Sequence, residues 1–117
     1  MRTLFERIGG TSAIERLVDN FYDRLTHDPR VLHHFDGHRL PSLKHGQCVW
    51  LTNALGGPTS ETIPDLRAAH SKLEITDEQV AAVVAHLDQA VEASGIDDEV
   101  RRQVMALVAR LWFARSF

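Results

Sequence analysis

The stretch TSAIERLVDNFYDRL, residues 11–25, has the spacing of an amphipathic α-helix. Its apolar side chains recur every three or four residues, so they share one face of a helix. These residues are Ile14, Leu17, Val18, Phe21 and Leu25. Ser12 and Glu15 have the spacing of a capping box, which predicts that the helix begins there. Tyr22 falls at the edge of the apolar face, where its ring can be buried while its hydroxyl needs a polar partner.

Helical periodicity continues on the C-terminal side of this stretch. Residues 28–35 are typical of a short helical turn with Asp28 as its cap, and three longer segments follow at 40–55, 76–94 and 97–113. Their predicted apolar faces consist of Leu40, Leu43, Trp50, Ala54, Val80, Val83, Val84, Leu87, Val91, Val100, Val104, Leu107, Val108 and Leu111. No segment alternates convincingly at a period of two. The pattern therefore predicts an all-α domain of five or six helices.

Capping residues and glycines support these boundaries. Thr76 and Gln79 have capping-box spacing before the apolar face at 80–91, and Gly95 stands where that helix should end. The glycine pairs at 9–10 and 56–57 are expected to end helices and to allow sharp reversals of the chain.

Length, charge and cysteine content narrow the class of protein. A chain of 117 residues with 44% hydrophobic and 25% charged residues is typical of one globular domain, here residues 1–117. A net charge of −3 makes neither nucleic acid nor an anionic membrane a default partner. No apolar run is long enough to span a membrane. The single cysteine, Cys48, cannot form an internal disulfide, so a cytoplasmic location is expected.

Three predicted helices each place one polar residue within or beside an apolar face. Gln47 interrupts the face of the helix at 40–55, His70 stands between Leu66 and Leu73, and Tyr22 borders the first helix. Each is open to two interpretations. The three can be separate core residues with local hydrogen bonds, or they can converge on one apolar cavity with a few polar groups, as in a cofactor site.

The chain resembles the truncated haemoglobins of the first group, which are short globins with a two-over-two helical sandwich around a haem. The resemblance rests on motifs in matching order and spacing: IGG at 8–10, NFYDRL at 20–25, DPRVLHHFDG at 28–37, LKHGQ at 43–47, ALGGP at 54–58, LRAAH at 66–70 and VAHL at 84–87. It covers almost the whole chain. It implies a truncated globin fold and haem b as the cofactor.

The resemblance assigns a role to each of the three polar residues. His70 would be the proximal ligand of the haem iron, because neutral imidazole is the usual ligand on that side in globins. Tyr22 and Gln47 would lie on the opposite, distal side of the haem. There they would donate hydrogen bonds to bound dioxygen.

The resemblance also implies contacts with the rest of the haem. Apolar contacts are expected from Phe35, Leu43, Leu66, Val80 and Val83. Arg67 precedes His70 by three residues and could reach a haem propionate, and Lys44 and Arg39 are weaker candidates. The alternative for these cations is an ordinary solvated surface charge.

The expected function is reversible binding of dioxygen, carbon monoxide or nitric oxide at the iron. Whether the protein is also an enzyme stays open, because bound dioxygen can oxidise nitric oxide to nitrate or support peroxidase chemistry. Such turnover would need a reductase that the sequence does not name. A haem-free helical interaction module is a further alternative.

Overall fold

The computed structural model describes residues 2–35, 39–58 and 76–114, with side chains described as far as residue 110. Its helices in these ranges are α1 (Leu4–Ile8), α2 (Thr11–Thr26), the 3-10 helix η1 (Leu32–Phe35), α3 (Leu40–Ala54), α5 (Asp77–Ala93) and α6 (Asp98–Ala114). The described ranges contain no strand, and the prediction of an all-α fold is confirmed. The predicted residues Leu66, Arg67 and His70 lie outside the described residues.

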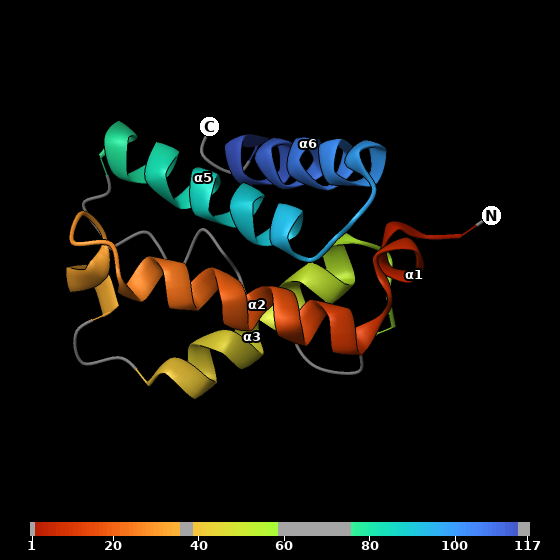
Figure 1. The fold of residues 1–117 in the computed structure, drawn as a ribbon, viewed down its shortest axis with the longest axis horizontal. Helices are drawn as coiled ribbons and strands as arrows, with labels where there is room; N and C mark the ends of the chain where they lie inside the picture. Colours follow the sequence, from red (N-terminus) through yellow and green to blue (C-terminus); the bar gives the residue numbers. More distant parts are fainter. Residues whose placement is uncertain (1, 36–38, 59–75, 115–117) are drawn as a thin grey trace.

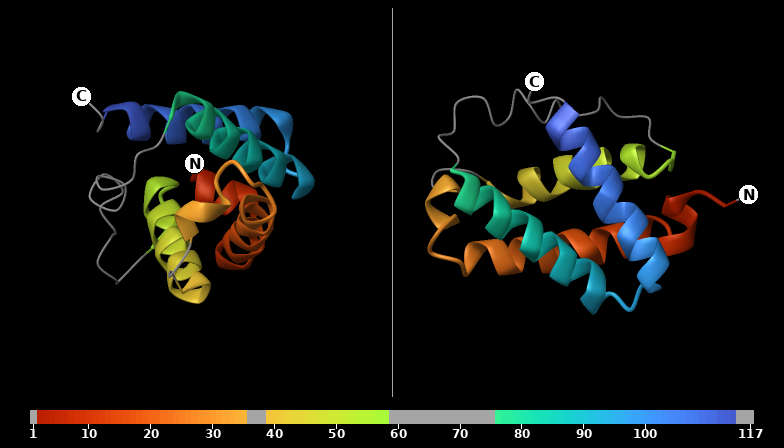
Figure 2. Two further views of the ribbon diagram at one scale, coloured as in Figure 1. Left: turned by 90° about the vertical axis from the view of Figure 1, so that its left-hand side faces the viewer. Right: turned by 90° about the horizontal axis from the view of Figure 1, so that it is seen from above.

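The helices form two layers of two (Figure 1). α2 and α3 make one layer, and α5 and α6 lie across it. α2 packs against α3 within its own layer and against α5 in the other, while α1 contacts α2 and α6. Seen from above, α5 and α6 diverge from the turn that joins them (Figure 2). This is the two-over-two arrangement that the resemblance implied.

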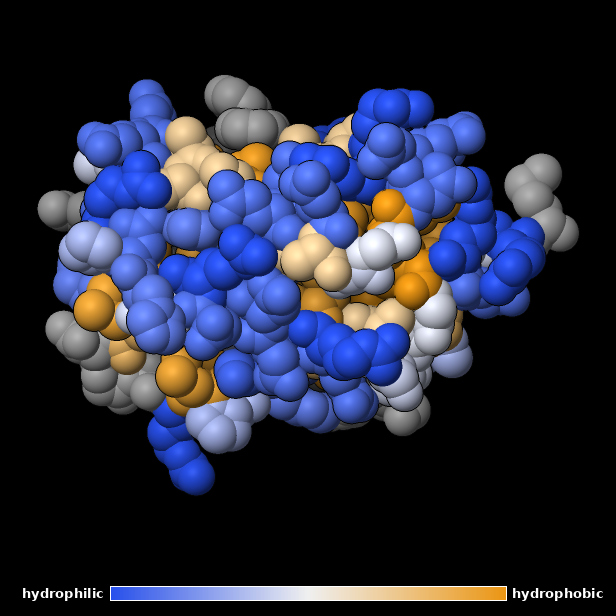
Figure 3. All heavy atoms as spheres, viewed as in Figure 1, coloured by the Kyte–Doolittle hydropathy of each residue, from blue (hydrophilic) through white to orange (hydrophobic). Residues whose placement is uncertain are grey.

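The hydrophobic core lies between the two layers. All five predicted apolar residues of α2 are buried, with 6% or less of each exposed. α3 contributes Trp50 and Leu51, and α5 contributes Leu87 and Val91. The face seen in Figure 3 is mostly hydrophilic, and its apolar atoms show as separate patches. None of the helices in the described ranges is long and apolar enough to cross a membrane.

The predicted start of α2 is wrong. The helix begins at Thr11, and its N-cap is Gly10, which makes no side-chain capping hydrogen bond. Ser12 is therefore already inside the first turn. The backbone explains the difference, since Gly9 and Gly10 both have positive φ angles (114° and 80°) and turn the chain directly from α1 into α2.

A capping box occurs instead at α1, which ends at Gly9 as expected but whose start and cap the sequence did not predict. The Thr3 hydroxyl accepts a hydrogen bond from the Glu6 N–H at 3.1 Å, and the Thr3 N–H donates to the Glu6 carboxylate at 3.3 Å. The Phe5 N–H donates to the Leu55 carbonyl at 2.9 Å, which holds α1 against the end of α3. Gly57 allows this approach, because a Cβ at that position would lie 2.6 Å from the Phe5 ring.

Both predicted ends of α5 are confirmed, but one predicted core residue is not. Thr76 and Gln79 form the expected capping box, and Gly95 follows the C-cap in the left-handed region with φ 73°. Val84, predicted to be buried, is 39% exposed. It lines an open groove between α5 and α6, which diverge along their length, whereas the small residues Ala82 and Ala90 are buried.

Candidate functional site

Tyr22 is held in a cluster of aromatic rings between α2 and η1. Its ring meets Phe21 at 5.5 Å and Phe35 at 5.8 Å between centroids, both edge to face. Such pairs stabilise beyond the area they bury and fix ring orientation. Only 8% of Tyr22 is exposed, and η1, which ends at Phe35, packs against α2. The structure thus brings together two of the predicted site residues, Tyr22 and Phe35.

The Tyr22 hydroxyl is the candidate donor that this cluster orients. It makes no hydrogen bond with any residue in the part of the chain that the structure describes. Burial raises the pKa of Tyr22 to about 12, with a further contribution from Cys48. The phenol therefore keeps its proton at neutral pH and can donate it to a ligand.

α3 presents Leu43 and Gln47 one turn apart, so the two share a face of the helix. Both are half-buried, and Leu43 packs against the core cluster. Over the described ranges, the Gln47 amide makes no hydrogen bond. Cys48, the next residue, adds to the raised pKa of Tyr22, and α3 as a whole packs against α2, the helix that carries Tyr22.

Lys44 is engaged in an ion pair. Its ammonium nitrogen lies 3.2 Å from a carboxylate oxygen of Asp19 on α2, and about a third of the lysine side chain is exposed. Any contact of Lys44 with a haem propionate would have to compete with Asp19. Arg39, the other weaker candidate, is the exposed N-cap of α3.

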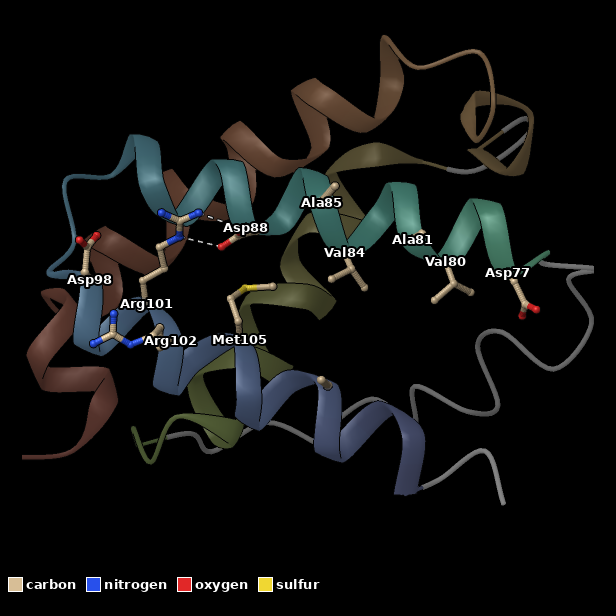
Figure 4. Close-up of a pocket in the computed structure, with 11 residues that line it drawn as sticks. Asp77, Val80, Ala81, Val84, Ala85, Asp88, Asp98, Arg101, Arg102 and Met105 are labelled. Atoms are coloured by element: carbon tan, nitrogen blue, oxygen red, sulfur yellow. Dashed lines mark hydrogen bonds and ion pairs between the residues drawn. The ribbon is translucent and has the colours of Figure 1, made fainter.

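The two predicted valines of α5 lie in different surroundings. Val83 packs against the core cluster. Val80 lines a groove of about 980 Å³ between α5 and α6, where it lies near Val84 on the same helix (Figure 4). Met105 and Ala109 line the groove from α6, and charged residues surround it, including Arg101 in contact with Asp88.

One polar cluster was missed by the sequence reading. Asp28 is buried with 7% exposed, and its carboxylate receives hydrogen bonds from Arg30 and lies 2.7 Å from the His86 Nε2. Asp28 was predicted as a helix cap, and it does accept from the Arg30 N–H at 2.9 Å. His86 had no predicted role, and its only signal was a histidine beside the apolar face of α5.

The family model described as bacterial-like globin matches residues 3–116. The chain belongs to the bacterial-like globin family. This family comprises haem-iron proteins that bind gases, and the resemblance to truncated haemoglobins is confirmed.

Individual globins agree in sequence and in fold. The chain is 32% identical over 109 residues to a group 1 truncated haemoglobin of Mycolicibacterium paratuberculosis, covering 93% of this chain and 80% of that protein. The Fe(III) truncated haemoglobin of Tetrahymena pyriformis superposes with a TM-score of 0.86, 25% identity and 93% coverage of both chains. The group II truncated haemoglobin of Bacillus anthracis gives a TM-score of 0.82 and 34% identity over 91% of this chain and 84% of that one.

The residues described here fit a haem in a globin of this kind. Tyr22 and Gln47 carry donors that make no hydrogen bond within the ranges the structure describes, and the Phe35 ring lies edge to face beside Tyr22. Both donors are uncharged. Tyr22 belongs to the hydrophobic core cluster, and Gln47 lies one turn after the apolar Leu43 on α3, as in pockets that orient a ligand with a few polar groups. A neutral donor pair of this kind fits the ligand side of a haem. His70, Arg67 and Leu66 lie outside the described residues and stay predictions.

Proposed function

We propose that this globin binds haem b through His70 and reversibly takes up dioxygen and other diatomic gases, with Tyr22 and Gln47 donating hydrogen bonds to the gas. The observation that carries the proposal is the buried, protonated Tyr22 phenol, whose donor has no acceptor among the described residues. Haem iron, when bound, would supply the position at which a diatomic gas attaches, and dioxygen attached there would carry partial negative charge.

The two donors have different parts in holding that gas. Tyr22 is fixed by the rings of Phe21 and Phe35, so its hydroxyl is oriented before a ligand arrives. Gln47 stands on a separate helix, α3, and can donate through its amide group. Two donors from different helices make a hydrogen-bonded network around a charged acceptor, and such bonds are stronger than those between neutral groups.

The remaining predicted contacts would hold the cofactor. His70 would ligate the iron and Arg67 would pair with a propionate. Apolar contacts to the ring would come from Leu43, Leu66, Val80 and Val83. Because Lys44 is paired with Asp19 at 3.2 Å, we place Arg67 ahead of it as the propionate partner.

The proposal is tested by adding haem to the purified protein and recording spectra of the oxidised, reduced, oxygenated and carbonyl forms. Stoichiometric binding with a Soret band that shifts with each gas is expected. His70→Leu should lose most bound haem, and added imidazole should restore the spectrum of His70→Gly. Wild-type protein without a Soret band would contradict the proposal, as would unchanged spectra in His70→Leu.

Nitric oxide separates gas binding from enzymatic turnover. If the oxygenated protein makes one equivalent of nitrate and stops, reversible binding is the main activity. Sustained nitrate formation with a reductase and a reduced nicotinamide would instead establish a nitric oxide dioxygenase.

A further inference from the structure

The chain between α2 and α3 turns on Asp28, a buried carboxylate. Arg30 donates hydrogen bonds to this carboxylate. Its Nε lies 3.0 Å from Oδ1 and its terminal nitrogen 2.8 Å from Oδ2, and its backbone N–H donates to Oδ1 at 2.9 Å. The backbone N–H groups of Val31 and Leu32 donate to the Asp28 carbonyl at 3.1 and 2.9 Å. The carboxylate and the backbone carbonyl of Asp28 therefore both stabilise the turn that leads into η1.

α5 supplies the remaining partner of this carboxylate. The His86 Nε2 lies 2.7 Å from Asp28 Oδ2, and 16% of the His86 side chain is exposed. The His86 Nδ1 is buried and has no hydrogen-bond partner among the described residues. This geometry places a proton on Nε2, which donates to Asp28, and among the described residues Asp28 is the polar group that orients the His86 ring.

A second set of contacts joins residues 28–35, here called the corner, to α5 at Gln79, two turns before His86. The Gln79 amide donates to the Arg30 carbonyl at 3.0 Å, and its oxygen lies 3.2 Å from the His34 Nε2. That oxygen also accepts from the Thr76 N–H at 3.0 Å as part of the α5 capping box. α5 thus contacts the corner at Asp28, Arg30 and His34.

Phe35, the last residue of this corner, connects it to the candidate site. Its ring meets Tyr22 edge to face, with the centroids 5.8 Å apart. A shift of the corner away from α5 would move the Phe35 edge relative to the Tyr22 ring. The direction of the Tyr22 hydroxyl would then be less well fixed.

We propose that Asp28 and His86 are positioning residues that hold the corner 28–35 on α5, keep Phe35 against Tyr22, and thereby set how fast dioxygen leaves the site. Neither residue needs to touch the gas or the cofactor. This inference rests on the proposed function, because it concerns the donor that the proposal assigns to Tyr22.

The test compares dioxygen dissociation rates of four holoproteins by stopped flow. His86→Leu removes the donor, whereas His86→Gln can place an amide N–H near the position of Nε2. Asp88→Asn is the matched control, because it weakens the Asp88–Arg101 contacts of 2.7 and 2.8 Å on the same helix without touching the corner. His86→Leu should speed dissociation about two- to thirty-fold, and His86→Gln should restore most of the wild-type rate while Asp88→Asn leaves it unchanged.

Coupling to Tyr22 distinguishes positioning from general destabilisation. In a Tyr22→Phe background, His86→Leu should have little further effect on dioxygen dissociation, because the donor it positions is gone. Should His86→Leu fail to fold, His86→Asn replaces it, since its shorter amide does not reach Asp28. In the carbonyl form, whose ligand is a weak acceptor, both variants should change dissociation much less.

The outcomes separate this inference from the proposed function. If Tyr22→Phe speeds dioxygen dissociation but His86→Leu and His86→Asn match Asp88→Asn, the positioning role alone is overturned. Additive effects of His86→Leu and Tyr22→Phe would overturn it too. If the protein binds no haem, the proposed function fails. The corner can then still be read from nuclear Overhauser contacts between the Phe35 and Tyr22 rings, and unchanged contacts in His86→Leu would contradict the positioning role.

Discussion

At the scale of single residues, Tyr22 should discriminate between ligands by charge. A hydrogen bond to a charged acceptor contributes about 1.5–3 kcal/mol, and about 1.4 kcal/mol corresponds to a factor of ten. Tyr22→Phe should therefore speed dioxygen dissociation roughly ten- to a hundred-fold. Carbon monoxide acquires little charge, so its dissociation should change much less. Stopped-flow rates for both gases check this, and an equal change for both would mean that Tyr22 only packs.

Gln47→Leu should act in the same direction as Tyr22→Phe. The dioxygen dissociation rate of the double variant should increase by less than the product of the two single increases, because both side chains donate to one acceptor. Independent, additive effects would place the two side chains in separate environments.

Asp28 should make stability depend on pH. Hydrogen bonds from Arg30 and His86 hold the pKa of the Asp28 carboxyl well below its usual range. A carboxyl with a lowered pKa in the folded state stabilises that state above its unfolded pKa of about 3.9 and loses the effect as pH falls. Asp28→Asn should therefore be less stable than the wild type at pH 7, and the difference should shrink below about pH 4. Urea unfolding at the two pH values measures it, with Asp23→Asn as an exposed control on the same segment.

The residue-scale features differ in how far sequence could predict them. The burial of Tyr22 follows from its place beside the apolar face of residues 14–25, a local property. The Asp28–His86 contact joins residues 58 positions apart, and neither has a periodic signal that identifies the other. Only the packing of α2 against α5 brings them together, so the contact could not be predicted from local pattern.

At the scale of the helices, capping should separate α5 from α2. The Thr76 hydroxyl accepts from the Gln79 N–H at 3.1 Å, whereas the α2 N-cap, Gly10, has no side chain to do so. Thr76→Ala should cost about 1 kcal/mol of the free energy of unfolding. Ser12→Ala, inside the first turn of α2, should cost little. Chemical denaturation of both variants decides between them, and equal losses would mean that Ser12 caps α2 after all.

The error at α2 has a definite physical source. Ser12 and Glu15 match the capping-box pattern, but the positive φ angles of Gly9 and Gly10 place the N-cap at Gly10, two residues before Ser12. Periodicity predicted the body of each long helix, because the buried face determines it. The start of a helix also depends on the backbone conformation before it, which the residue types of Ser12 and Glu15 do not determine. α1 has only five residues and is too short to show a helical period.

At the scale of the whole molecule, the divergence of α5 and α6 decides which predicted core residues are covered. Val100 and Val104, near the turn that joins the helices, are 3% and 1% exposed. Val80, farther along α5, lines the groove, and Val84 is 39% exposed. A helical pattern predicts an apolar face but not how far a neighbouring helix extends over it. The fold class was therefore predictable, whereas the burial of the N-terminal half of α5 was not.

The haem should contribute to the stability of the whole chain, because a ligand that binds only the native state shifts unfolding by mass action. At a free haem concentration one hundred times its dissociation constant, the gain is about 2.7 kcal/mol. The melting temperature of the wild type should therefore rise with added haem, and that of His70→Leu should rise much less. Without haem the two proteins should melt at similar temperatures, because the role proposed for His70 is ligation of the iron. Differential scanning calorimetry at several haem concentrations measures both effects. A wild-type melting temperature that does not depend on haem would place the cofactor outside the folded core.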